Sequence, residues 1–209
     1  NAALKNGTII NLAIGRGVEN LILDNISDGE GGSHVFAGGG SGSILLRGQT
    51  RLKGTVYITS REALGIKADS PQAVIAGNVV VKTIMPVTIN APVQGELRIL
   101  ASSEPVVIKS EVARITALAS TVIKICRSLD ESKRPRLAKA AGVEVTAGIV
   151  DEQGQDTGEA VDIEESEDLS PAEPFIFSID QVSADVKVND SYILPTVVEA
   201  ILSDRSKVH

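Results

Sequence analysis

The chain has 209 residues, and 43% of them are hydrophobic, which supplies enough apolar surface for a core and excludes disorder along the whole chain. The 27 acidic residues outnumber the 20 basic ones, and the net charge of -7 repels phosphate backbones, so we expect no nucleic-acid partner. The apolar residues are mainly Val, Ile, Leu and Ala, with no Trp, two Tyr and three Phe, and such small branched side chains favour closely stacked strands.

Short apolar runs typical of β-strands recur between residues 8 and 125. Gly, Asn, Asp, Ser or Pro separate the runs, whose starts mostly lie about 6 to 14 residues apart. The expected strands are residues 8–14, 20–26, 34–36, 43–47, 55–59, 73–76, 79–82, 87–89, 97–100, 106–108, 113–116 and 121–125. This spacing fits either a β-sandwich or a solenoid of coiled strands.

The pattern inside the runs favours the solenoid. Alternate apolar positions, such as Ile10, Leu12 and Ile14, would direct one stripe of side chains inward. Stacked turns would bury these stripes as a continuous column, whereas the gaps are too short for the helices of a doubly wound α/β fold. We therefore predict an all-β chain in which residues 1–126 form a single-stranded parallel β-helix, which we expect to be right-handed.

Glycines cluster around the expected strand at residues 34–36. We expect the backbone to turn sharply there with positive φ angles, which glycine adopts at no steric cost. The cluster consists of Gly29, Gly31, Gly32, Gly38, Gly39, Gly40 and Gly42. A phosphate-binding loop at residues 38–40 is disfavoured, because neither a Lys-Ser/Thr pair nor a helix follows the glycines.

Three acidic residues, Asp24, Asp28 and Glu30, fall in one Gly-containing segment. A polysaccharide lyase would need an acidic calcium cluster and a base, for which Arg47 or Arg51 is the candidate, and a glycosidase would need two carboxylates across a cleft. The spacing is that of a surface turn, and no aromatic platform for sugar stacking lies nearby. We expect a solvated turn, with weak calcium binding as an alternative.

Two other side chains could carry chemistry. His34 could act as a general base, but no Ser or Asp partner stands in a recognisable motif, so we expect a surface or turn residue. Cys126 cannot form an internal disulfide, and we expect it to be a small buried side chain at the end of a strand. With two histidines and one cysteine, no metal-ligand spacing appears, so we expect no catalytic residue, no cofactor and no metal site.

The composition changes after residue 126. Residues 127–150 are interrupted by Pro135, so we expect a loop or one short helix that caps the solenoid, or an extra coil, ending in a strand at residues 143–150.

Residues 151–174 are acidic and end in two prolines, which predicts a solvated linker, and the acidic segment 162–168 lacks EF-hand spacing. A β pattern returns in residues 175–209, as a second module.

The segment NGTIINLAIGRGVENLILDNISDGEGGSHVFAGGGSGSILLRG, residues 6–48, resembles the β-helical region of Gram-positive surface proteins that carry S-layer homology modules. Residues 38–45 are its most specific part. From there to about residue 125 the resemblance is looser, and in the end only the spacing of the short strands matches. The resemblance implies a spacer, scaffold or adhesive surface and brings no catalytic residues with it.

The segment SADVKVNDSYILPTVVEAILSDRSKVH, residues 183–209, is similar to the first half of bacterial Ig-like modules. The matching positions are Leu194, Pro195, Ser203, Asp204 and Ser206, whereas Arg205 stands where that family usually has Gly. The resemblance implies a partial Ig-like β-sandwich, completed by a further segment or another chain.

We therefore expect a non-catalytic structural or spacer module of a bacterial cell-envelope protein, exported to the cell surface, and not an enzyme. Its expected partners are other envelope subunits, wall glycans or further copies of itself. No run approaches the roughly 20 apolar residues of a membrane span, and without an initial Met we expect a piece of a longer protein. The alternatives are a carbohydrate-binding or adhesion module, which the scarcity of aromatic residues disfavours, and a lyase-like enzyme.

Overall fold

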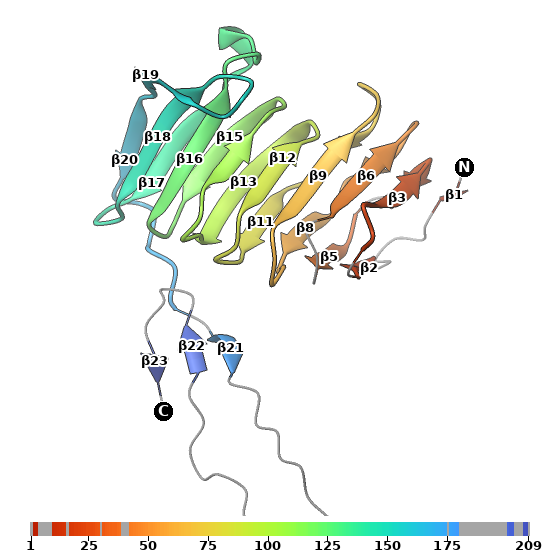
Figure 1. The fold of residues 1–209 in the computed structure, drawn as a ribbon, viewed down its shortest axis with the longest axis horizontal. Coiled ribbons are helices and arrows are strands. Elements are labelled where there is room, and N and C mark those ends of the chain that lie inside the picture. The colour runs from red at the N-terminus through yellow and green to blue at the C-terminus, as the bar shows by residue number, and fades with distance from the viewer. Residues whose placement is uncertain are drawn as a thin grey trace, which may run out of the picture.

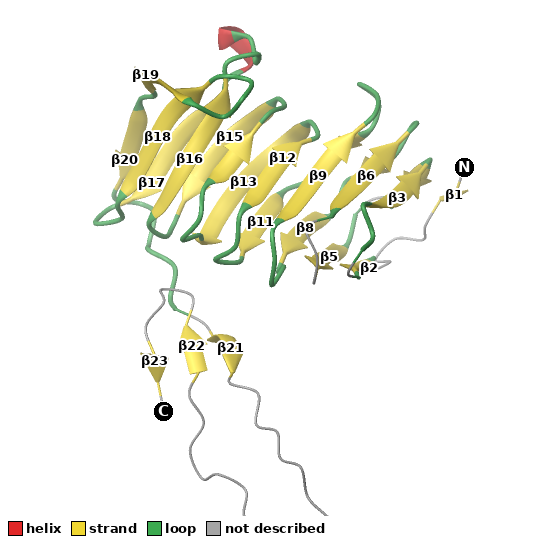
Figure 2. Ribbon diagram, in the orientation of Figure 1, coloured by secondary structure: helices red, strands yellow, loops and turns green. Residues whose placement is uncertain are grey.

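A computed structural model describes residues 2–3, 10–15, 17–29, 31–38, 42–174, 176–179, 200–202 and 207–208. In these residues the regular structure is β throughout, except for one short 3₁₀-helix, η1 (Glu131–Lys133), drawn in red in Figure 2. Most of the strands stack in parallel into a solenoid of about seven turns (Figure 1). The predictions of an all-β chain and of a parallel β-helix are confirmed.

The strands of the solenoid form three columns, which the chain visits in the same order on each turn up to β15; between β16 and β18 no described strand lies in the second column. The first column contains β3 (Asn20–Asp24), β6 (Ser43–Arg47), β9 (Leu64–Ala68), β12 (Val87–Asn90), β14 (Val106–Ile108), β16 (Thr121–Cys126) and β18 (Val145–Val150). The second contains β1 (Ala2–Ala3), β4 (Ile26–Ser27), β7 (Arg51–Leu52), β10 (Val74–Ile75) and the first residues of β13 (Val93–Ala101) and β15 (Val112–Ala117). The third contains β2 (Asn11–Ile14), β5 (Ser33–Gly38), β8 (Thr55–Ile58), β11 (Val79–Lys82), the remainder of β13 and β15, β17 (Arg136–Ala140) and β20 (Ile163–Ser166).

The core is built from inward side chains that lie directly above one another on successive turns. In the first column the paired residues are Leu21, Ile44, Ile66, Ile89, Ile108, Ile125 and Ile149. All six isoleucines are 0% exposed, and burial of each such side chain contributes about 1.5–3 kcal/mol. The alternation of buried and exposed residues therefore produces the continuous apolar column that the sequence predicts.

The turns differ in length although the core positions stay in register. From Ile66 to Ile89 the turn takes 23 residues, from Ile89 to Ile108 it takes 19, and from Ile108 to Ile125 it takes 17. The next turn, from Ile125 to Ile149, takes 24. Because the columns remain aligned, the shorter turns have fewer residues in the corners between the columns.

Glycine is required where successive turns pass closest, at the corner between the second and third columns. Gly32, Gly54, Gly77 and Gly95 follow one another on consecutive turns, and a Cβ on Gly54, Gly77 or Gly95 would collide with the backbone of the glycine one turn earlier. A side chain at these positions would force the turns apart.

The predicted positive φ angles are found at Gly29 (68°) and Gly31 (118°). Gly38 lies instead at the end of β5, and Gly39 and Gly40 lie outside the described residues. The close approach at the corner was not predicted.

After residue 126 the structure agrees with one of the two alternatives for residues 127–150, the extra coil, and differs from the prediction for residues 151–174. Residues 127–150 form a further turn, since β17 and β18 both continue the parallel columns. Residues 151–174, predicted to be a solvated linker, contain β20, which pairs in parallel with β17, and β19 (Asp156–Ala160), which pairs antiparallel with β18. These strands tolerate acidic residues because they remain largely exposed at this end of the stack, where Val161 and Ile163 pack against the core.

The C-terminal part contains β21 (Ile176–Ile179), β22 (Ala200–Leu202) and β23 (Lys207–Val208), which form a three-stranded antiparallel sheet. Most of the residues that carry the resemblance to an Ig-like module, including Leu194, Pro195 and residues 203–206, lie outside the described residues.

Replacing Gly77 by alanine tests the close contact at the corner. The added Cβ meets the carbonyl oxygens of Gly54 and Lys53, so we expect the variant to lose about 1–3 kcal/mol of unfolding free energy in urea titrations. Gly15→Ala is the control, because nothing lies within 4 Å of a Cβ built there. Equal stability of the two variants would contradict the corner contact.

Candidate functional site

The acidic residues singled out in the sequence do not form a common site. Asp24 is exposed and accepts a hydrogen bond from the Asn25 side chain at 2.7 Å, whereas Glu30 lies outside the described residues. Asp28 is 0% exposed, so the expectation that it belongs to a solvated turn is wrong. The segment folds back between β4 and β5, which carries this carboxylate inside the solenoid.

His34 is also buried, at 0% exposure, and the expectation of a surface residue is wrong. Its Nε2 atom lies 2.8 Å from Oδ2 of Asp28, and its Nδ1 atom accepts a hydrogen bond from the backbone N–H of Ile10 at 3.2 Å. Because Nδ1 accepts, the ring proton is placed on Nε2, which donates to the carboxylate.

The carboxylate of Asp28 is bound from the next turn as well. Its Oδ1 accepts the backbone N–H of Lys53 at 2.8 Å, and its Oδ2 accepts that of Gly54 at 2.7 Å. Burial raises the pKa of Asp28, but the hydrogen bonds from Lys53, His34 and Gly54 outweigh it and hold the pKa below its ordinary value. The pair thus connects Ile10, the residue before β2, with the β4–β5 segment and the following turn.

His34 occupies a core position that is apolar on the later turns. The residues paired in this position are His34, Val56, Val79, Leu97, Ile115, Leu137 and Ile163. The alternation within β5 gives a sequence signal for this placement, because His34 lies two residues before the core residue Phe36 and therefore faces the same side. The sequence gives no such signal for Asp28, the partner of His34, because Asp28 lies outside β5, in the segment before it.

A general base needs a nitrogen that can reach a proton of the substrate. In His34 one ring nitrogen is bonded to Ile10 and the other to Asp28, and the side chain is closed off from solvent. This arrangement suits the structural connection of turns and gives the ring no free acceptor.

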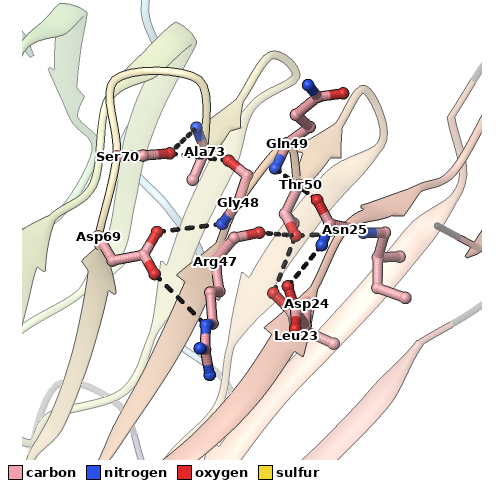
Figure 3. A network of polar contacts seen from close by, with 11 residues as sticks. Leu23, Asp24, Asn25, Arg47, Gly48, Gln49, Thr50, Asp69, Ser70 and Ala73 are labelled. Carbon is pink, nitrogen blue, oxygen red and sulfur yellow. Dashed lines mark hydrogen bonds and ion pairs between the residues drawn. The ribbon is translucent and has the colours of Figure 1, made fainter.

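A second polar network lies at the corner between the first and second columns (Figure 3). The buried hydroxyl of Thr50 lies 2.8 Å from the carbonyl oxygen of Leu23 and 2.7 Å from that of Arg47, and it accepts the N–H of Ile26 at 3.2 Å. One threonine therefore satisfies backbone groups on two adjacent turns.

Side chains of Asn25 and Asp69 extend this network along the corner (Figure 3). Asn25, which has a φ of 52°, accepts the N–H of Gln49 at 3.0 Å, and Asp69 accepts the N–H of Gly48 at 3.0 Å. The other oxygen of Asp69 lies 3.7 Å from Nε of Arg47. Arg47 is thus occupied with turn contacts, and Arg51 donates to Gln94 at 2.9 Å.

In the part of the chain that the structure describes, no group of three or more His, Cys, Asp or Glu residues could hold a metal ion. Cys126 is buried at the end of β16, as predicted, with its sulfur 3.2 Å from the hydroxyl of Ser128. In the acidic segment, Glu165 pairs with Lys139 at 2.6 Å. Among the described residues, no helix has the length and apolar character required to cross a membrane.

Two open grooves lie along the corners of the solenoid. A groove of about 550 Å³, between the third and first columns, is partly filled by the chain itself, where Ala172 donates its N–H to the carbonyl of Leu118 at 2.6 Å. A groove of about 620 Å³ crosses the corner between the first and second columns, and its borders include Asn90, Lys109 and Lys133. Sequence reasoning found neither, because both depend on how separate turns lie beside one another.

Comparisons with protein-family models, with curated proteins and with solved structures found no match to this chain.

Replacing Asp28 by asparagine tests the buried connection. The two oxygens of Asp28 accept hydrogen bonds from Lys53, Gly54 and His34, whereas an asparagine has one oxygen and would place its NH₂ group against one of these donors. We therefore expect a loss of about 1–3 kcal/mol of unfolding free energy at pH 7. The lowered pKa means that the carboxylate contributes stability above the ordinary value of 3.8, and that this contribution is lost as the pH falls through the lowered pKa.

The difference between the wild type and Asp28→Asn should therefore shrink in urea titrations as the pH is lowered below 3.8. Asp24→Asn, which removes an exposed carboxylate, is the matched control and should change stability by less than about 0.5 kcal/mol. A difference that stays constant with pH would show that Asp28 does not act as a buried anion.

Proposed function

We propose that this chain is a non-catalytic structural module of a bacterial cell-envelope protein and acts outside the cell as a rigid spacer or scaffold. The observation that supports this best is the unbroken apolar column, in which isoleucines on six consecutive turns are fully buried. Turns that share one core cannot shift separately without exposing it, so the stack behaves as a stiff body.

The buried polar groups support the same role. Asp28 and His34 connect successive turns through backbone N–H groups, and Thr50 does so at another corner. A lyase-like reaction through Asp28 receives no support, since its carboxylate is buried and fully hydrogen-bonded.

The dimensions limit how far one module can reach. Six steps between seven rungs, each about 4.8 Å, give an axial length of about 29 Å. At one end β19 runs antiparallel along β18 and occupies the edge to which another parallel turn would add. One chain therefore contributes a short block, and a longer spacer requires neighbouring modules.

The placement in the cell envelope rests on resemblance. Residues 6–48 resemble the β-helical region of S-layer-type surface proteins, and residues 183–209 resemble the start of an Ig-like module. An antiparallel sheet formed by β21, β22 and β23 is compatible with a partial sandwich. The proposed partners are other envelope subunits, wall glycans or further copies of the chain.

Single-molecule pulling tests the spacer role, with handles at residues 17 and 174. We expect the solenoid to unfold as one cooperative unit, and Ile89→Ala to lower its stability by about 2–5 kcal/mol and reduce the unfolding force. Ile22→Ala is the control, because Ile22 is 48% exposed and lies outside the column. Turn-by-turn unravelling of the wild type would rule out a rigid spacer.

Antibodies raised against residues 42–174 test the proposed location. They should label intact cells of the source organism, and brief protease treatment of those cells should remove the signal. Labelling that appears only after lysis would contradict a surface protein.

A further inference from the structure

The groove between the first and second columns is formed by the difference in turn length. The segment that joins these columns runs from Ile66 to Ile75 on one turn, a separation of 9 residues, but from Ile89 to Val93 on the next, a separation of 4. From Ile108 to Val112 the separation is again 4. On two consecutive turns, the segment that joins the first and second columns is therefore shorter than on the turn before.

The longer segments on either side form the walls of this notch, and the shortened corners form its floor. One wall contains Ser70, Pro71 and Val74, and the other contains Leu129 and, from η1, Lys133. The floor contains Asn90, Pro92, Val93, Gln94, Lys109, Ser110, Glu111 and Ala113. The notch is thus a feature of the fold, with a volume of about 620 Å³ that lies within the usual range of ligand sites.

Several polar side chains in the notch make no hydrogen bond or ion pair with another described residue. They are Asn90, Lys109, Ser110, Glu111 and Lys133, and both lysines are exposed. Lys109 belongs to the floor of the notch and Lys133 to its wall, so two lysine residues line the same cavity. In the corner of Figure 3, by contrast, Thr50, Asn25 and Asp69 are all used in contacts between turns.

We propose that this notch binds a linear acidic oligosaccharide, with carboxylates of the sugar chain bound by Lys109 and Lys133. Asn90, Ser110 and Glu111 offer donors and acceptors for hydroxyl groups, and Pro71 and Pro92 offer apolar contact for the faces of the rings. The notch spans four turns, about 14 Å along the axis, which suits several linked sugars better than one.

An extended peptide fits this site less well. Peptides that add to a sheet need unpaired backbone N–H and C=O groups, whereas the rungs around the notch are paired with one another along the columns. This binding role goes beyond the spacer function and does not depend on it.

Titration of the full chain with hexagalacturonate, followed by NMR or calorimetry, tests the proposal, with the neutral xylohexaose as the comparison glycan. We expect binding of the acidic hexamer only. Lys109→Gln and Lys133→Gln should each weaken it about tenfold, because each removes a charge-assisted hydrogen bond. Lys53→Gln, an exposed lysine outside the notch, is the matched control and should leave the affinity unchanged.

Ser110→Trp separates a shaped site from general attraction between charges. A large side chain on the floor should abolish binding while circular dichroism and the urea midpoint stay those of the folded chain. The proposal is wrong if hexagalacturonate does not bind, if xylohexaose binds equally, or if Lys53→Gln weakens binding as much as Lys109→Gln. It is also wrong if an acidic peptide of equal charge binds and the glycan does not.

Discussion

The stacking of one branched apolar side chain per turn, in constant register, is the constraint on which the rest of this structure depends. A slip of one residue in β12 would turn Ile89 outward and leave Ile66 and Ile108 without their partner in the column. Since every turn has the same requirement, the columns stay aligned although the turns range from 17 to 24 residues. Variation in length therefore accumulates at the corners.

The corners need more specific chemistry than the columns do. Backbone groups that turn there leave the parallel ladder, and buried N–H and C=O groups need partners. Asp28 provides these for Lys53 and Gly54, and Thr50 provides them for Ile26. At the corner between the second and third columns, successive turns lie too close together for any side chain. Glycine is needed there, as at Gly77. The stiffness proposed for the module arises from both devices.

The difference between columns and corners also separates the two proposed roles, the spacer function and the binding of a glycan. The core determines a short, stiff block, which supports a spacer function, and it offers little to a ligand because its polar groups are already bonded. The two shortened corners leave a notch whose lysines, Lys109 and Lys133, make no ion pair with another described residue. The proposed binding site is thus added at the corners and leaves the columns unchanged.

The sequence by itself determined the all-β class, the positions of most strands and the burial of Cys126, because alternation of apolar residues is a local property of each strand. It also contained a signal for the core position of His34, two residues before Phe36, although the prediction of a surface residue was wrong. Tertiary structure alone decided that Asp28 is the partner of His34, that Gly32, Gly54 and Gly77 stack, and that residues 151–174 contribute the last strands. It also placed Lys109 and Lys133 in the lining of one notch. These relations depend on which residues of neighbouring turns lie side by side, and that register is fixed only when the whole core assembles.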